Sequence, residues 1–96
     1  MRRVYNNYLN PLGYYDNNYI YDINDNVLGF YDGNTLYNRY GYALGYYDGS
    51  RLYNNYGTLA GYYNDYTVYD SSYNTVGFLD NAFDWILAAA LLFLLL

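Results

Sequence analysis

The stretch LGYYDGSRLYNNYGTLAGYYN, residues 44–64, contains a Gly-aromatic-aromatic phrase twice, at a spacing of sixteen residues. The same spacing continues outward in both directions and defines a glycine column: Gly13, Gly29, Gly45, Gly61 and Gly77. A tyrosine column keeps the same period, each member following an aliphatic residue: Tyr5, Tyr21, Tyr37, Tyr53 and Tyr69. A fixed period of this kind indicates a tandem-repeat protein with about five units.

Each unit is expected to contain two short strands and two turns. The segments DGNT (32–35) and DGSR (48–51) are typical turns, because Asp bonds nearby backbone and Gly accepts a positive φ. Loops of four residues would place Tyr46 opposite Tyr53 across one strand pair, and Tyr53 opposite Ala60 across the next. The pattern therefore predicts a continuous antiparallel ladder of hairpins.

Side-chain alternation along the strands then predicts two faces. Leu44, Tyr46 and Tyr53 are expected on one face, with Gly45, Tyr47 and Leu52 on the other. A glycine in a strand leaves room for a neighbouring tyrosine ring to lie over the backbone. The alternative for this glycine column is a β-bulge.

A single hairpin of this length cannot bury enough apolar surface to be stable, so the units must pack on one another or on a second chain. The predicted fold class is all-β, with tandem 16-residue β-hairpin repeats over residues 1–80. The hairpins could close into a flower-like ring or continue as an open solenoid or meander, because both arrangements use the same local rules.

Residues 81–96 do not follow the 16-residue repeat and form the second predicted segment, an apolar helix or tail. Asp84 is suited to cap the helix, and residues 86–96 are uncharged and apolar. At about 1.5 Å per residue this helix is too short to cross a bilayer core of about 30 Å. Three interpretations stay open: packing over a sheet face or a partner chain, shallow membrane contact through Trp85 to Leu96, and an artefact of a generated sequence.

Composition excludes several functions. Four Arg and nine Asp, with a net charge of -5, argue against a nucleic-acid partner. The chain has no His, Cys or Lys, so the common nucleophilic mechanisms lack their residues. Asp16, Asp32, Asp48 and Asp80 recur with the repeat, and bonding of the turn backbone explains them without catalysis. The sequence predicts no enzyme, no cofactor and no metal site.

The segment DINDN (22–26) has alternating oxygen side chains like a calcium loop, but it lacks the loop's glycine and bidentate glutamate. The N-terminus, MRRVYNNYLNPLG, lacks the apolar stretch of a signal peptide. The localisation is therefore left unknown, with membrane association through the C-terminus as an alternative.

Residues 36–64, LYNRYGYALGYYDGSRLYNNYGTLAGYYN, resemble the four-fold β-flower proteins, whose units follow a Tyr-Asn-x-x-Gly-x-x-x-Gly-aromatic pattern. The resemblance extends over about residues 4–80 and implies hairpins arranged about a pseudo-symmetric axis, with no established activity to carry over. A weaker resemblance is to choline- and glucan-binding cell-wall repeats, which carry an aromatic pair like Tyr46 and Tyr47 but are longer and contain tryptophan.

The function expected from these features is that of a structural, self-assembling module whose partner is a second copy, as a closed oligomer or a filament. One alternative is a glycan-binding module in which tyrosines stack on sugar rings: Tyr15, Tyr31, Tyr47 and Tyr63. Another is a repeat protein anchored to a membrane by its C-terminus. The narrow amino-acid alphabet is also typical of low-complexity or designed sequences.

Overall fold

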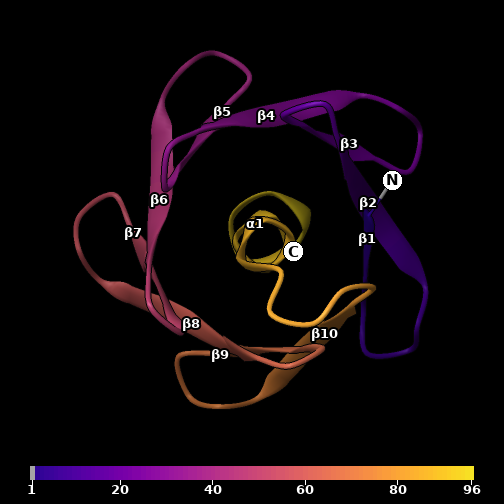
Figure 1. Cartoon of the computed structure of the whole chain (residues 1–96), viewed down its shortest axis with the longest axis vertical. Coiled ribbons are helices and arrows are strands. Elements are labelled where there is room, and N and C mark those ends of the chain that lie inside the picture. Colours follow the sequence, from indigo (N-terminus) through magenta and orange to yellow (C-terminus); the bar gives the residue numbers. More distant parts are fainter. Residues whose placement is uncertain (1) are drawn as a thin grey trace.

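The computed structural model describes residues 2–96 and shows a ring of antiparallel strands around a central helix (Figure 1). The strands are β1 (Arg2–Tyr5), β2 (Pro11–Asp16), β3 (Tyr19–Asp22), β4 (Val27–Asp32), β5 (Thr35–Asn38), β6 (Ala43–Asp48), β7 (Arg51–Asn54), β8 (Leu59–Asn64), β9 (Thr67–Asp70) and β10 (Thr75–Leu79). They form a closed barrel in the order β1-β10-β9-β8-β7-β6-β5-β4-β3-β2. The open solenoid is thereby excluded, and the molecule is a disc of 30 × 29 × 19 Å.

The hairpins have the register that the sequence predicts. Tyr46 lies opposite Tyr53, and the two rings stack on the outer face with their centroids 5.5 Å apart. Gly49 occupies the turn between them with a φ of +62°. The equivalent Asn17 has a φ of +54°, so Asn and Gly serve the same turn position.

The second strand pair of each unit contains a bulge, which corrects the expected pairing of Tyr53 with Ala60. Leu52 lies opposite Gly61, but Tyr53 lies opposite Leu59, and Ala60 is the extra residue between them. The same shift occurs beside Gly29, Gly45 and Gly77. The bulge also corrects the expected face of Leu44, which is half-buried and packs against the core instead of lying with Tyr46.

The ring closes through the two ends of the chain. β1 pairs with β10, with Val4 opposite Leu79 and Tyr5 opposite Phe78. Asp80 reinforces the closure, because its Oδ2 accepts a hydrogen bond of 3.1 Å from the Arg3 amide while its own amide donates to the Arg3 carbonyl at 3.1 Å. The fifth hairpin is therefore assembled from residues far apart in the sequence.

The C-terminal segment fills the barrel (Figure 1). Helix α1 (Trp85–Ala90) continues into a π-helical turn, η1 (Leu91–Leu95). Residues 87–91 are buried, with exposures of 1% or less, among a belt of aliphatic side chains: Val4, Ile20, Leu36, Leu52 and Val68. The inner face of the closed sheet thus covers the apolar helix, so the expected packing over a sheet face occurs inside the barrel.

The glycine column faces this helix, one glycine for each residue of η1. A Cβ on Gly45 would lie 2.6 Å from the Phe93 ring and would also meet the Tyr53 carbonyl oxygen. The pairs of glycine and helix residue are Gly77 with Leu91, Gly61 with Leu92, Gly45 with Phe93, Gly29 with Leu94, and Gly13 with Leu95. The expected tyrosine ring over the glycine is therefore wrong, since a helix side chain occupies that space.

A π-helical turn suits this environment. Neighbouring units of a five-fold ring are about 72° apart, and an i→i+5 helix turns about 82° per residue, against about 100° for an α-helix. The Leu96 amide donates to the Leu91 carbonyl at 3.1 Å, which is the i→i+5 bond. Consecutive residues of η1 therefore face consecutive units of the ring. An α-helix, with its larger rotation per residue, would match the spacing of the units less well.

The helix starts at the buried carboxylate of Asp84. Its Oδ1 accepts from the Leu87 amide at 3.4 Å, which confirms the predicted cap. The Arg2 Nε lies 2.9 Å from Oδ2, and the Arg2 guanidinium carbon lies 4.4 Å from the centroid of the Tyr15 ring. Burial raises the pKa of Asp84, while Arg2 opposes this shift. No helix within residues 2–96 is long and apolar enough to cross a bilayer.

Candidate functional site

The four tyrosines expected to stack on sugars lie on the inner face of the barrel. Tyr31 is 4% exposed and Tyr63 is 6% exposed, while Tyr15 and Tyr47 are half-buried against the core. Trp85 stacks on Tyr47 with the centroids 4.7 Å apart and meets Tyr31 edge-on at 5.2 Å. Their ring faces are therefore taken up by the protein's own core, because the strand face that carries the glycines also carries these rings.

Two of the inner tyrosines also have their hydroxyls satisfied. Tyr31 donates to the Ile86 carbonyl in the first turn of α1, and Tyr63 donates to the Gly49 carbonyl at 2.9 Å. Burial raises the pKa of Tyr63 to about 12, and it raises that of Tyr31 as well. These phenols are structural groups that stay neutral at ordinary pH.

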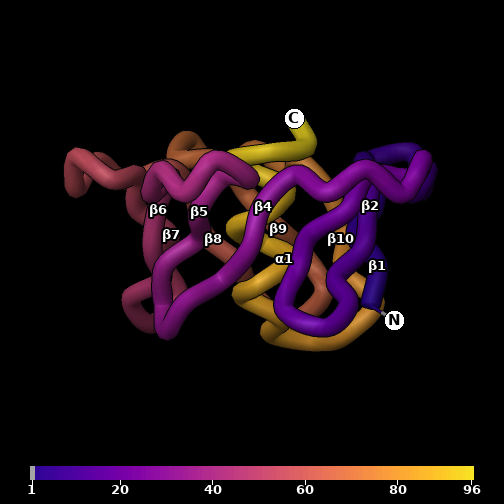
Figure 2. Tube along the Cα trace, turned by 90° about the horizontal axis from the view of Figure 1, so that it is seen from above, coloured from indigo at the N-terminus to yellow at the C-terminus, as the bar shows by residue number. Residues whose placement is uncertain are grey.

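The outer surface is dominated by five loops that extend from one end of the barrel, which we call the petal loops (Figure 2). They are residues 6–10, 22–26, 38–42, 54–58 and 70–74. The first residue of each is Asn or Asp, and its Oδ1 accepts from the amides two and four positions later at 2.8–3.0 Å. This column is Asn6, Asp22, Asn38, Asn54 and Asp70.

The resemblance of DINDN to a calcium loop has a different explanation in the structure. The Asp22 carboxylate accepts bonds from the Asn24 and Asn26 amides and from the Asn26 side chain. The bonds from Asn26 lower the pKa of Asp22. The carboxylate therefore organises its own loop, and residues 2–96 contain no cluster of three potential metal ligands.

The fourth residue of every petal loop has a left-handed backbone: Leu9, Asp25, Gly41, Gly57 and Tyr73. In three petals this residue lies beside the outward aromatic residue on the first strand of the hairpin that precedes the loop. Asp25 accepts a hydrogen bond from the Tyr14 hydroxyl, and Tyr73 stacks on Tyr62. A Cβ on Gly57 would lie 3.9 Å from the Tyr46 hydroxyl. This repeated position thus carries Leu, Asp, Gly, Gly and Tyr in the five petals.

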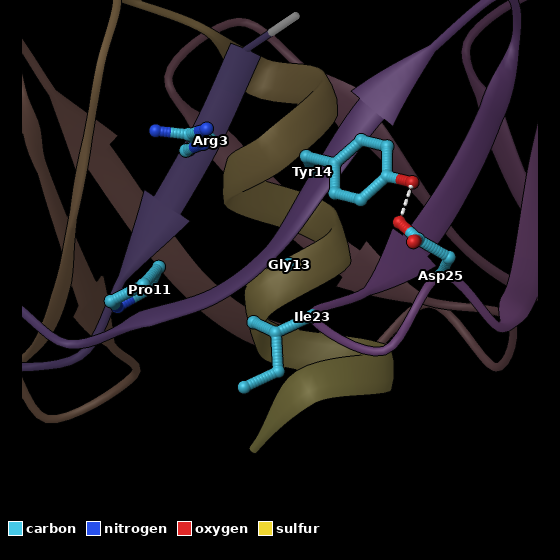
Figure 3. Close-up of a pocket in the computed structure, with 6 residues that line it drawn as sticks. All are labelled: Arg3, Pro11, Gly13, Tyr14, Ile23 and Asp25. Carbon is cyan, nitrogen blue, oxygen red and sulfur yellow. Dashed lines mark hydrogen bonds between the residues drawn. The ribbon is translucent and has the colours of Figure 1, made fainter.

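One hollow on the outer surface surrounds the Tyr14–Asp25 pair (Figure 3). It measures about 360 Å³ and is also lined by Arg3, Pro11 and Ile23. Figure 3 shows the Tyr14 hydroxyl directed at Asp25, with Arg3 on the other side of the hollow. The hydrogen bond to Asp25 raises the pKa of Tyr14 to about 12. Because the Tyr14 hydroxyl and the Asp25 carboxylate already hydrogen-bond to each other, this hollow offers few free polar groups to a ligand.

A second hollow of about 420 Å³ lies beside β8 and β9. Tyr62 and Tyr73 stack in it with their centroids 4.3 Å apart and their planes at 6°. The lining residues are Ser50, Tyr62, Tyr63, Asn64, Tyr69, Tyr73 and Phe83. This hollow combines exposed aromatic rings with a hydroxyl and an amide, which is the composition of a small-molecule site.

Sequence reasoning did not single out the Asn/Asp column, Tyr73 or Phe83. The column could have been found, since its members are sixteen residues apart like the glycines. The recurring turn aspartates were expected to bond their own turns, but among the described residues Asp80 bonds the Arg3 amide of another strand, and no such turn bond is found for Asp16, Asp32 or Asp48. Tyr73 and Phe83 break the repeat, and a search for periodicity discards such residues.

The ring of hairpins around a helix defines a class of closed β-repeat proteins, and comparison with known families identifies it. The chain matches the family described as "5-fold beta-flower protein" over residues 1–96, and it belongs to that family. The five-fold family replaces the four-fold family that the sequence resembled, and its count agrees with the five predicted units, the last hairpin being formed by β1 and β10. Searches of curated proteins and of solved structures gave no match. The family supports the interpretation of the chain as a structural repeat module.

Proposed function

We propose that this protein is a non-catalytic structural module that associates with a second copy of itself. The association would use the petal rim, which is the end of the barrel that carries the petal loops and Leu96 (Figure 2). The closed ring leaves no strand of residues 2–96 without a partner on either side. Association therefore has to use side chains rather than added strands, and a filament built by strand pairing is disfavoured.

The observation that carries the proposal is the exposure of large side chains on the petal rim. Tyr8 and Tyr56 are 85% and 86% exposed, Tyr40 and Tyr42 are each 71% exposed, and Leu96 is 70% exposed. Exposed apolar and aromatic groups gathered at one end of a small protein are typical of an interaction surface. Tyrosine is also enriched in such surfaces, because it combines apolar area with a polar end.

A second copy fits this rim by symmetry, and charge sets the salt dependence of the contact. Two identical rims that meet face to face form a closed, isologous dimer. The petal loops carry one cation, Arg39, and three carboxylates, Asp22, Asp25 and Asp70. A rotation of one ring against the other can therefore bring Arg39 of each copy close to a carboxylate of its partner. The net charge of -5 opposes the contact, so added salt should strengthen it.

Sedimentation velocity of the full chain over a range of concentrations and salt tests this proposal. We expect a concentration-dependent dimer that is favoured by salt and weakened at least tenfold by the double substitution Tyr40→Ser and Tyr56→Ser. The matched control is Tyr66→Ser, since Tyr66 is 49% exposed in a turn at the opposite end of the barrel. A chain that stays monomeric throughout, or a double variant that dimerises like the parent, contradicts the proposal.

Contact of Trp85 to Leu96 with a membrane stays a prediction. In the structure Leu87–Leu91 are enclosed by the barrel, so this contact would require the helix to leave it.

A further inference from the structure

The hollow beside β8 and β9 is built by two aromatic residues with unusual backbone conformations. Tyr73 has a φ of +65° and Phe83 a φ of +57°. Bulky side chains rarely adopt this region, and such residues tend to occur where function requires them. Within residues 2–96 these are the two aromatic residues with positive φ, and both line the same hollow.

Comparison of the five petals shows that Tyr73 is not required by the fold. Two equivalent positions are Gly41 and Gly57, which adopt the left-handed conformation without a side chain. At Tyr73 the chain instead places a ring that covers Tyr62 and remains 66% exposed. Phe83 is 59% exposed, and its amide donates to the Asp65 carbonyl at 2.8 Å, which holds it at the turn between β8 and β9. The hollow therefore has an aromatic ring at each end of the β8–β9 hairpin.

The polar groups of the hollow are neutral. Ser50 supplies a hydroxyl and Asn64 an amide, and none of the described lining residues is charged. Its volume of about 420 Å³ lies within the range of about 300–1,000 Å³ that is usual for ligand sites. The chain carries a net charge of -5, which disfavours phosphates and acidic sugars at long range, although the cation Arg51 lies opposite Tyr62 beside the hollow.

We propose that this hollow binds a neutral oligosaccharide, with Tyr73 and Phe83 as the platforms on which pyranose rings rest. A pyranose presents C–H groups on its face and hydroxyls around its edge. The C–H face packs on an aromatic ring, and the hydroxyls pair with Ser50, Asn64 and the tyrosine hydroxyls. This site shares Tyr63 with the inner tyrosine column that the sequence suggested, but its platforms are Tyr73 and Phe83, and it does not depend on self-association.

The test is titration of the full chain with cellopentaose, chitopentaose and maltopentaose, followed by calorimetry and by intrinsic fluorescence. We expect saturable binding of at least one of these neutral sugars. The substitution Tyr73→Gly should weaken that binding at least tenfold, and this variant should fold because Gly41 and Gly57 occupy the equivalent positions.

A second variant, Phe83→Asn, should also weaken binding, since Asn tolerates a left-handed backbone. The control is Tyr19→Ser, which removes an exposed ring from β3, outside this hollow and the petal loops, and should leave the affinity unchanged. The proposal is overturned if none of the three sugars binds saturably, or if Tyr73→Gly and Phe83→Asn bind as tightly as the parent chain.

Discussion

Glycine has two separate roles in this protein. Gly45 sits in a strand, where a Cβ would meet the Tyr53 carbonyl oxygen and the Phe93 ring. Gly49 sits in a turn with a φ of +62° and has nothing within 4 Å of the position of a Cβ. The first glycine is required by a close approach and the second by backbone conformation, so the two should respond differently to substitution.

We expect Gly45→Val to destabilise the protein by about 3 kcal/mol or more, because the new side chain overpacks the helix contact. Gly49→Asn should change stability by no more than about 1 kcal/mol, since Asn17 already adopts the equivalent conformation. Chemical denaturation of both variants measures the difference. Equal tolerance of the two would show that the helix does not need the glycine column.

The helix is the element on which the ring depends. Each residue of η1 lies against the glycine of one unit, so a single short segment contacts all five units. The aliphatic belt alternates with these glycines around the ring, as the pairing of Leu52 with Gly61 shows. Aliphatic residues and glycines therefore alternate around the helix. The side chains of η1 pack into the space that the glycines leave open.

Leu91→Ala is expected to cost about 2–5 kcal/mol, because Leu91 is fully buried and faces Gly77. Leu96→Ala at the exposed end of the same segment should cost within about 0.5 kcal/mol. Thermal denaturation of the two variants compares them directly. A loss within about 0.5 kcal/mol in both variants would indicate that the helix leaves the barrel in solution.

At the scale of the whole molecule, pH acts through the phenols of the barrel interior. Burial raises the pKa of Tyr63 to about 12 and also raises that of Tyr31, relative to about 10 in an unfolded chain. The folded protein therefore holds more protons than the unfolded chain above this pH. The contribution of these groups to stability is complete below pH 10 and is lost as the pH rises toward 12.

We expect the free energy of unfolding to fall between pH 10 and pH 12, with tyrosinate absorbance appearing in the same interval as the loss of structure. Tyr63→Phe should reduce the slope of this fall, because one perturbed group is removed. Stability that is independent of pH in this interval would contradict the burial of these rings.

Much of the fold could be predicted from the order of residues alone, because a period of sixteen residues and Asp-Gly turns act locally. The hairpins, the pairing of Tyr46 with Tyr53 and the cap at Asp84 all follow from neighbours in the chain. The candidate site was less predictable. Tyr31 and Tyr63 were placed correctly on one strand face, but alternation along a strand does not say which face turns inward.

The tertiary structure decided three things: the closure of the ring, the position of the helix and the exposure of each tyrosine column. Closure depends on contact between β1 and β10, which no local pattern encodes. The apolar helix needs a cover, and the closed barrel is the one element large enough to supply it. Once the helix lies inside, the glycine face must turn toward it, and the inner tyrosines are buried with that face.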